Sequence, residues 1–218
     1  MSVARAAVLA SVRRALGARI SAGGVEARLA EPPSGVIPSR ARNNAVQMFL
    51  EGAARVGTTV AAVSSAGDVP AQIAAYLAAR NLPATLKLAP DPRLRAMPWA
   101  EASMLTTAEG LGEDQDAVGV VHAFAGVAET GTLVLVSGPE SPTTLNCLPD
   151  THVIVLDAGD LVGAYDDAWA RLRTRGAMPR LVTWITGPSR TADIEQEILI
   201  GIHGPRRLHV VMIDAGQA

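Results

Sequence analysis

Residues 127–138 read Val127-Ala-Glu-Thr-Gly-Thr-Leu-Val-Leu-Val-Ser-Gly138, and they place a carboxylate and two hydroxyls directly before four apolar residues. The apolar residues predict a central strand, and the polar residues on either side then mark its two ends. Because six residues of extended chain span about 20 Å, Glu129 and Ser137 are expected at opposite edges of the sheet. A ligand site would therefore use one end only, and we expect that end to join the turn at Thr186.

Other apolar segments have the length and the β-branched composition of further strands. They are residues 58–64, 85–89, 118–122, 152–156, 181–186 and 208–213. Helical patterns lie over residues 2–16, over 43–56 and after Asp68. One long helix is predicted over 160–174, with a buried stripe of Leu161, Ala164, Tyr165, Ala168 and Leu172. The alternation predicts a three-layer α/β domain, in which helices flank a mixed, mostly parallel central sheet.

The composition indicates one main domain with an aliphatic core. The 218 residues are 49% hydrophobic, 18% charged and 3% aromatic, which fits a single α/β domain. We place this domain at residues 43–218, after an N-terminal helix and a Pro/Gly-rich arm in residues 1–42. The net charge of -2 argues against nucleic-acid binding. Short apolar runs, with Arg5 inside any signal-like core, argue against a membrane span or secretion, so we expect a cytoplasmic protein.

Cysteine and histidine usage bounds the redox and metal chemistry. The lone Cys147 cannot supply the four thiolates of an iron-sulfur cluster, so any such cluster belongs to a partner, and we expect no cofactor in this chain. Apolar neighbours predict that Cys147 is a small buried hydrophobe. His122, His152 and His209 lie in strand patterns and are interpreted as satisfied structural histidines, whereas His203 lies in a glycine loop. Their spacing matches no metal motif.

The turn that follows residues 181–186 is a candidate anion site. It contains Gly187, Ser189 and Arg190, and it leads into Thr191 and Asp193, where we predict the start of a helix. Free amide groups at such a start, beside an arginine, would hold a phosphate or a carboxylate. The alternative is that Ser189 or Thr191 only caps the helix and that the acids of its first turn offset the helix dipole. Both interpretations stay open.

The segment Glu129-Thr130-Gly131-Thr132 is the second candidate. Glu129 could serve as a nucleophile, a general base or an acceptor for ligand hydroxyls, or it could be a solvated turn residue. Thr130 and Thr132 could bind a ligand or only bond the turn backbone. Residues 126–132 imitate a phosphate-binding loop, but the lysine is missing and a strand follows, which argues against a nucleotide triphosphatase. The sequence contains no Gly-x-Gly-x-x-Gly fingerprint.

Four ordered motifs resemble the lactate utilization protein C family, also called the LUD domain. They are Ala128-Glu-Thr-Gly-Thr-Leu-Val-Leu135 with Ser137-Gly-Pro139 after it, Leu145-Asn-Cys-Leu-Pro-Asp-Thr-His-Val153, Thr191-Ala-Asp-Ile-Glu195, and Gly201-Ile-His-Gly-Pro-Arg-Arg-Leu-His-Val210. The resemblance is strong over residues 100–214. In the N-terminal half it extends only to the order of helices and strands.

The resemblance implies a fold like that of ribose-5-phosphate isomerase and the CoA transferases. It also implies a role in oxidising L-lactate to pyruvate, as a cluster-free accessory subunit that works with iron-sulfur partner proteins and binds a small anionic metabolite. The alternative is a stand-alone enzyme of the same fold, of the CoA transferase, phosphosugar isomerase or folate cyclo-ligase type. Some CoA transferases of this fold use a glutamate nucleophile, which makes Glu129 the candidate catalytic residue. We favour Glu129 as a ligand-binding or turn-organising group.

Overall fold

The computed structural model describes residues 3–16, 24, 27, 30, 43–192 and 198–214. Contacts within the chain divide it into two units, residues 1–36 and 37–218. The described part of the first unit contains helix α1 (Val3–Leu16), as predicted, with Arg13 and Arg14 in its last turn where they complement the helix dipole. Most of the predicted arm at 23–42 lies outside the described residues.

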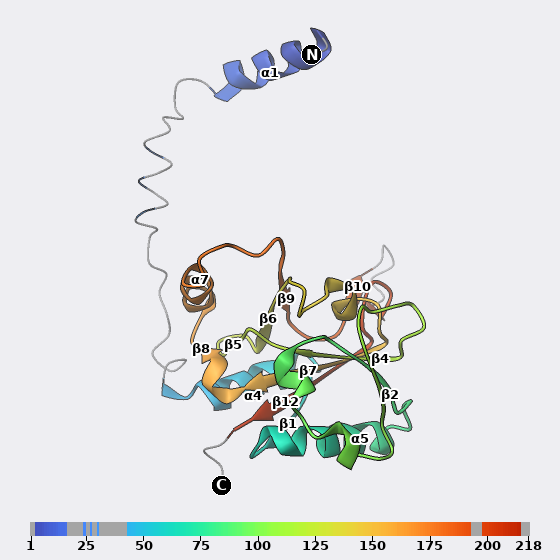
Figure 1. Ribbon diagram of the computed structural model, residues 1–218. Helices are drawn as coiled ribbons and strands as arrows, with labels where there is room; N and C mark the ends of the chain where they lie inside the picture. Colours follow the sequence, from blue (N-terminus) through green and yellow to red (C-terminus); the bar gives the residue numbers. More distant parts are fainter. Residues whose placement is uncertain are drawn as a thin grey trace. The chain divides into compact units, whose positions relative to one another are not determined.

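Six parallel strands form the central sheet of the second unit (Figure 1). In spatial order they are β1 (Thr59–Val63), β12 (Arg207–Ile213), β7 (Thr151–Asp157), β4 (Val118–His122), β2 (Thr85–Leu88) and β3 (Thr106–Glu109). All five neighbouring pairs are parallel. The interior strands β7 and β4 are almost wholly buried, which explains why they read as continuous apolar runs.

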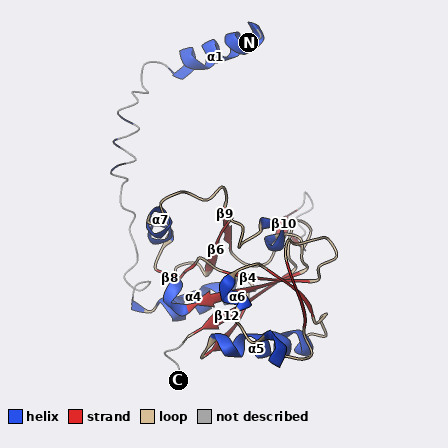
Figure 2. Ribbon diagram, viewed as in Figure 1, coloured by secondary structure: helices blue, strands red, loops and turns tan. Residues whose placement is uncertain are grey.

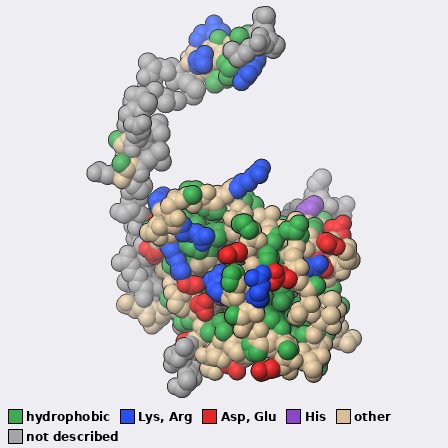
Figure 3. All heavy atoms as spheres, viewed as in Figure 1, with side chains coloured by type: hydrophobic (Ala, Val, Ile, Leu, Met, Phe, Trp, Pro, Cys, Tyr) green, Lys and Arg blue, Asp and Glu red, His purple; other side chains and the backbone are tan. Residues whose placement is uncertain are grey.

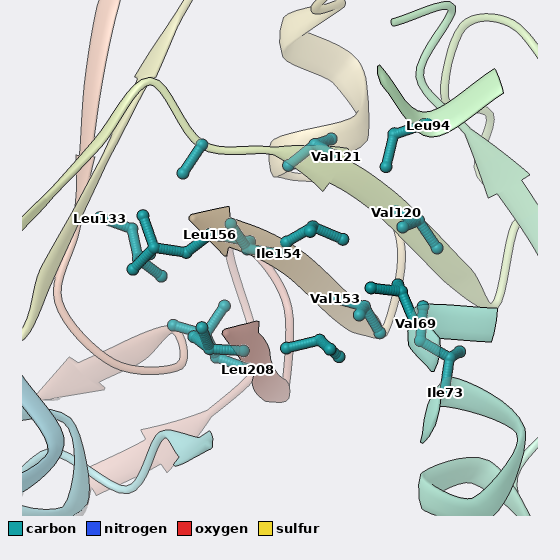
Figure 4. Close-up of a cluster of buried hydrophobic side chains, with 14 of the residues drawn as sticks. Val69, Ile73, Leu94, Val120, Val121, Leu133, Val153, Ile154, Leu156 and Leu208 are labelled. Atoms are coloured by element: carbon teal, nitrogen blue, oxygen red, sulfur yellow. The ribbon is translucent and has the colours of Figure 1, made fainter. Parts of the chain in front are cut away.

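Helices cover the sheet, as Figure 2 shows. They are α4 (Ala45–Arg55), α5 (Val69–Ala79) and the short α6 (Pro92–Arg95), whereas α7 (Tyr165–Arg173) contacts the strands at 125–127 and 161–162 instead. There are also 3-10 turns at Ala66–Asp68, Trp99–Glu101, Thr143–Asn146 and Ala158–Asp160. Figure 4 shows Val69 and Ile73 of α5 beside Val120 and Val153 of the sheet, and Leu133 beyond Leu156. The helix α5 and the residues around Leu133 therefore cover different parts of one buried core. The predicted α/β fold with a mostly parallel sheet is confirmed.

The apolar residues 132–136 lie in a second sheet. This sheet has the order β8 (Leu161–Val162), β5 (Ala125–Val127), β6 (Thr132–Val136) and β9 (Val182–Ile185). The pairs β5–β6 and β6–β9 are antiparallel, whereas β5–β8 is parallel. The turn between β5 and β6 is far too short for the crossover that parallel strands need. The expectation that residues 132–136 lie within the central sheet was therefore wrong.

Two predicted helices differ from the structure. The long helix begins at Tyr165 rather than near Asp160, because Leu161 pairs with Gly126 in the second sheet. The helix predicted at Thr191 is wrong, since β10 (Arg190–Ala192) pairs antiparallel with β11 (Ile198–Ile200). Among the described residues, no helix is both long and apolar enough to span a bilayer.

Candidate functional site

A cavity of about 420 Å³ lies where the central sheet presents the carboxyl ends of its strands. The chain leaves β2 toward the edge strand β3, but from β4 it continues toward β7 on the other side. Adjacent strands whose connections run in opposite directions open a crevice, and ligands of open α/β sheets bind there. Asp91 follows β2 and His122 ends β4, and both line this carboxyl-edge cavity.

Asp91 and Arg93 form a bidentate pair at the base of the cavity. Arg93 donates from Nε to Asp91 Oδ1 at 3.1 Å and from Nη2 to Asp91 Oδ2 at 2.7 Å, while its backbone amide donates to Oδ1 at 2.8 Å. Burial opposes ionisation of Asp91, but the hydrogen bonds and the charge of Arg93 outweigh it and lower the carboxyl pKa. The cavity therefore has a fixed, preorganised carboxylate at one wall.

His122 is held by two oxygen atoms. Its Nδ1 lies 3.0 Å from the Ala123 carbonyl oxygen, and its Nε2 lies 3.2 Å from Asp157 Oδ2. Both ring nitrogens must carry protons for both contacts to be hydrogen bonds. The interpretation of His122 as a satisfied histidine agrees with these contacts, yet the ring also lines the cavity.

Arginines of the α7 region, Arg171 and Arg175, also line the cavity. Arg171 pairs with Asp160, and the guanidinium carbons of Arg171 and Arg175 lie 5.1 and 5.2 Å from the centroid of the Phe124 ring. In the described part of the chain, no ion pair joins Arg175 to a carboxylate. Figure 3 shows basic and acidic side chains interspersed around α6 and α7, without a patch of one sign. Arg175 is thus the cation most available to a ligand here.

The hydroxyls of Thr130 and Thr132 form a hydrogen bond with each other. Thr132 is fully buried, and its Oγ1 lies 2.7 Å from Thr130 Oγ1, 2.8 Å from Tyr165 Oη and 2.7 Å from Thr186 Oγ1. This cluster joins the start of β6 to the end of β9, as expected for the Thr186 turn. Ser137, at the other end of β6, bonds Leu181 and lines the carboxyl-edge cavity. The two polar ends of the strand therefore have separate surroundings.

The glycines of both candidate turns pack against α4. Gly131 has φ 68°, and a Cβ there would collide with the backbone of Gly52 and Ala53. Gly187 has φ 84°, and a Cβ there would lie 2.8 Å from the Val56 carbonyl oxygen. Arg190 donates from Nη2 to the same oxygen at 2.8 Å, at the carboxyl end of the helix. Close packing accounts for these residue types.

Glu129 lines neither the carboxyl-edge cavity nor the second cavity, which contains Cys147. It is partly buried, and its backbone amide donates to the Gly163 carbonyl oxygen at 3.1 Å. The nucleophile interpretation of Glu129 gains no support from this position. Thr191 lies in β10, and Asp193 lies outside the described residues.

Three predicted site residues meet in a second cavity of about 230 Å³, here called the Cys147 cavity. Gly187, Ser189 and His203 line it together with Cys147 and His152. The thiol of Cys147 is exposed, so its prediction as a buried residue was wrong. It follows a 3-10 turn, Thr143–Asn146, whose Leu145 takes the buried position instead. No group of three or more His, Cys, Asp or Glu side chains that could hold a metal ion occurs among the described residues.

Residues 114–213 match the family model of the LUD domain, and this match spans β4 through β12. This region of the chain matches the LUD domain family. A curated Neisseria meningitidis protein named uncharacterized protein NMB1437 is 38% identical over 44% of this chain and 41% of its own length. Lactate utilization protein C of Geobacillus thermodenitrificans is 33% identical over 46% and 43%, and that of Bacillus subtilis is 30% identical over the same shares. The matched part thus spans less than half of these relatives.

A solved structure has a fold similar to that of this chain. A DUF162 family protein from Deinococcus radiodurans superposes with a TM-score of 0.59 and 21% identity, covering 81% of this chain and 99% of that one. At this identity the likeness shows the fold alone. It agrees with the α/β architecture described above.

The carboxyl-edge cavity contains residues that sequence reasoning missed. Asp91 and Arg93 precede the LUD match at 114–213, and Arg175 directly follows the helix that was predicted over 160–174. A usable signal existed, because polar residues that follow parallel strands gather at one edge. The Asp91-Pro92 pair after the predicted strand 85–89 carries that signal.

Proposed function

We propose that this chain acts in lactate utilization as a subunit without an iron-sulfur cluster, and that its carboxyl-edge cavity binds a small 2-hydroxy or 2-oxo carboxylate. Two relatives that match 46% of this chain are named lactate utilization protein C. The cavity lies at the switch point between β2 and β4, where ligands bind in folds of this kind. This position is the observation that carries the proposal.

The charges of the cavity suit a hydroxy or keto acid. Arg175 supplies a planar guanidinium with no carboxylate partner among the described residues, which suits a ligand carboxylate. The Ser137 hydroxyl, which accepts from the Leu181 amide at 2.9 Å, keeps its own proton for a ligand oxygen. The Asp91–Arg93 pair is already satisfied and limits the net charge of the site. A monocarboxylate therefore fits better than a phosphate.

Oxidation of lactate to pyruvate releases two electrons, and a redox centre of a partner protein would have to accept them. One cysteine cannot ligate an iron-sulfur cluster. We therefore include iron-sulfur partner proteins in the proposal. A strain that lacks this chain should grow poorly on L-lactate and normally on pyruvate, and tagged chain from that host should co-purify with iron-containing protein. Normal growth on L-lactate would contradict this part of the proposal.

Calorimetry with purified chain tests the ligand. L-Lactate and pyruvate should bind, whereas lactamide, which has no carboxylate, should not. The Arg175→Gln variant should weaken binding about tenfold or more, because a charge-assisted hydrogen bond is lost. The matched control is Arg173→Gln, an exposed α7 arginine that does not line the cavity. Equal weakening by both substitutions, or binding of lactamide as tight as that of lactate, would reject the assignment of the site.

A further inference from the structure

Two buried polar side chains in the Cys147 cavity have no hydrogen-bond partner. His152 is 0% exposed, and neither ring nitrogen has a partner; Asn146 is 5% exposed, and its Oδ1 has none. Each such group costs about 1–3 kcal/mol when nothing replaces its bond to water. Both residues line the same cavity. Unpaired groups of this kind need a hydrogen-bond partner from outside the chain, which is either water or a ligand.

The electrostatics of the cavity select an uncharged ligand. Burial lowers the pKa of His152 to about 3, so its imidazole is neutral at physiological pH and presents one donor and one acceptor. No Asp, Glu, Lys or Arg occurs among the described lining residues, which include the apolar Ile185, Pro188 and Leu208. A charged ligand would lose its hydration there without gaining a partner.

The walls of the cavity are preformed. Ser189 donates its amide to the Pro205 carbonyl oxygen at 2.9 Å, and its own carbonyl accepts from the Gly201 amide at 3.0 Å. These bonds hold the 186–189 turn against the glycine loop that contains His203. A rigid site of about 230 Å³ has room for a small ring rather than for a coenzyme.

We propose that the Cys147 cavity is a second binding site, which takes a small uncharged cyclic amide. The ring N–H donates to Asn146 Oδ1, and the adjoining carbonyl oxygen accepts from the neutral imidazole of His152. This pairing satisfies the Asn146 acceptor and the imidazole donor at once, which an ether or a carboxylate does not, because neither has a donor. The site is separate from the carboxyl-edge cavity, and the inference does not depend on lactate binding.

The thiol of Cys147 reports on occupancy. It is the single cysteine of the chain, it is exposed, and it lines the cavity. Its labelling by a disulfide reagent can be followed by absorbance while a probe is titrated. Uracil, which carries the N–H and C=O edge, should slow the labelling at least fivefold at saturation. 1,3-Dimethyluracil, which has the same ring without its donors, and L-lactate should leave the rate unchanged.

Substitutions locate the effect. His152→Phe and Asn146→Leu should each raise the uracil concentration needed for half-protection about tenfold or more. Leu148→Ala, at an exposed neighbour that does not line the cavity, should change nothing. Arg175→Gln should also leave uracil protection intact, which separates this inference from the lactate site. If a variant fails to fold, the uracil and dimethyluracil comparison on the unmodified chain still decides.

The proposal is overturned if uracil gives no protection, or if dimethyluracil protects equally. It is also overturned if protection survives in folded variants of both Asn146 and His152. Each of these outcomes would mean that the Cys147 cavity does not bind a cyclic amide through Asn146 and His152.

Discussion

Two buried histidines should make the stability of this LUD domain fall as the pH is lowered from 7 to 5. Burial lowers the pKa of His152 from 6.5 to about 3 and that of His209 to about 4, to which the nearby charge of Arg80 adds. The folded chain keeps both rings neutral in this range, whereas the unfolded chain protonates them. The unfolded state therefore binds more protons, and the free energy of unfolding decreases as the pH falls below 6.5.

The magnitude follows from the two pKa values. A pH of 5 lies 1.5 units below the ordinary histidine pKa of 6.5. Protonation in the unfolded chain therefore lowers the free energy of unfolding by about 2 kcal/mol for each ring and about 4 kcal/mol for both. The lowered pKa values of Asp68, Asp91 and Glu109 contribute little here, because carboxylates lose stability only near and below their ordinary pKa values. The histidines should therefore dominate the change above pH 5.

Urea denaturation followed by tryptophan fluorescence at pH 7 and pH 5 measures this change. His152→Phe and His209→Phe should each remove about half of the pH dependence, and Phe in place of His209 keeps a ring against Tyr76, which now stacks at 3.7 Å. His203→Gln, at an exposed position, is the control and should keep the full dependence. A His152→Phe variant whose stability falls with pH as steeply as that of the original chain would refute the reasoning.

Two further predictions concern the opening stretch, and urea denaturation measures both. Gly131→Ala should destabilise the fold by about 3 kcal/mol, because a side chain there has an unfavourable φ and collides with Ala53 of α4. Gly138→Ala, where nothing lies within 4 Å, should change stability by less than about 0.5 kcal/mol, and equal effects would contradict the packing account. Thr132→Val should cost about 1–3 kcal/mol, since it strips the buried hydroxyl that bonds Thr186; an unchanged midpoint would show that this bond is unimportant.

Local patterns identified most of the elements because their signals lie within single segments. Residues 118–122 and 152–156 are apolar over strand length, and the structure has β4 and β7 there. Strand β3 was missed, since its four residues are all exposed and carry no apolar pattern. The sequence at Thr191 has the capping pattern of a helix start, but no helix begins there. Pairing with β11 gives the backbone a different set of hydrogen bonds.

The sequence could predict the residue types of the site, but not which residues lie next to one another in the folded chain. Gly187, Ser189 and His203 do line one cavity, but Glu129 lines neither described cavity. Arg190 was a plausible anion ligand by type, yet it bonds the Val56 carbonyl oxygen, which lies 134 residues away in sequence. No spacing rule links such pairs.

The sequence by itself determined that this chain alternates helices with buried strands, resembles the LUD family over residues 114–213, and has one cysteine. Periodicity and composition are local properties, so a single segment carries them. Only the tertiary structure decided that residues 132–136 join a second sheet, that Asp91 and His122 share a switch-point crevice, and that His152 is left unpaired beside Cys147. Each of these depends on strand order and register, which are settled by contacts between distant segments.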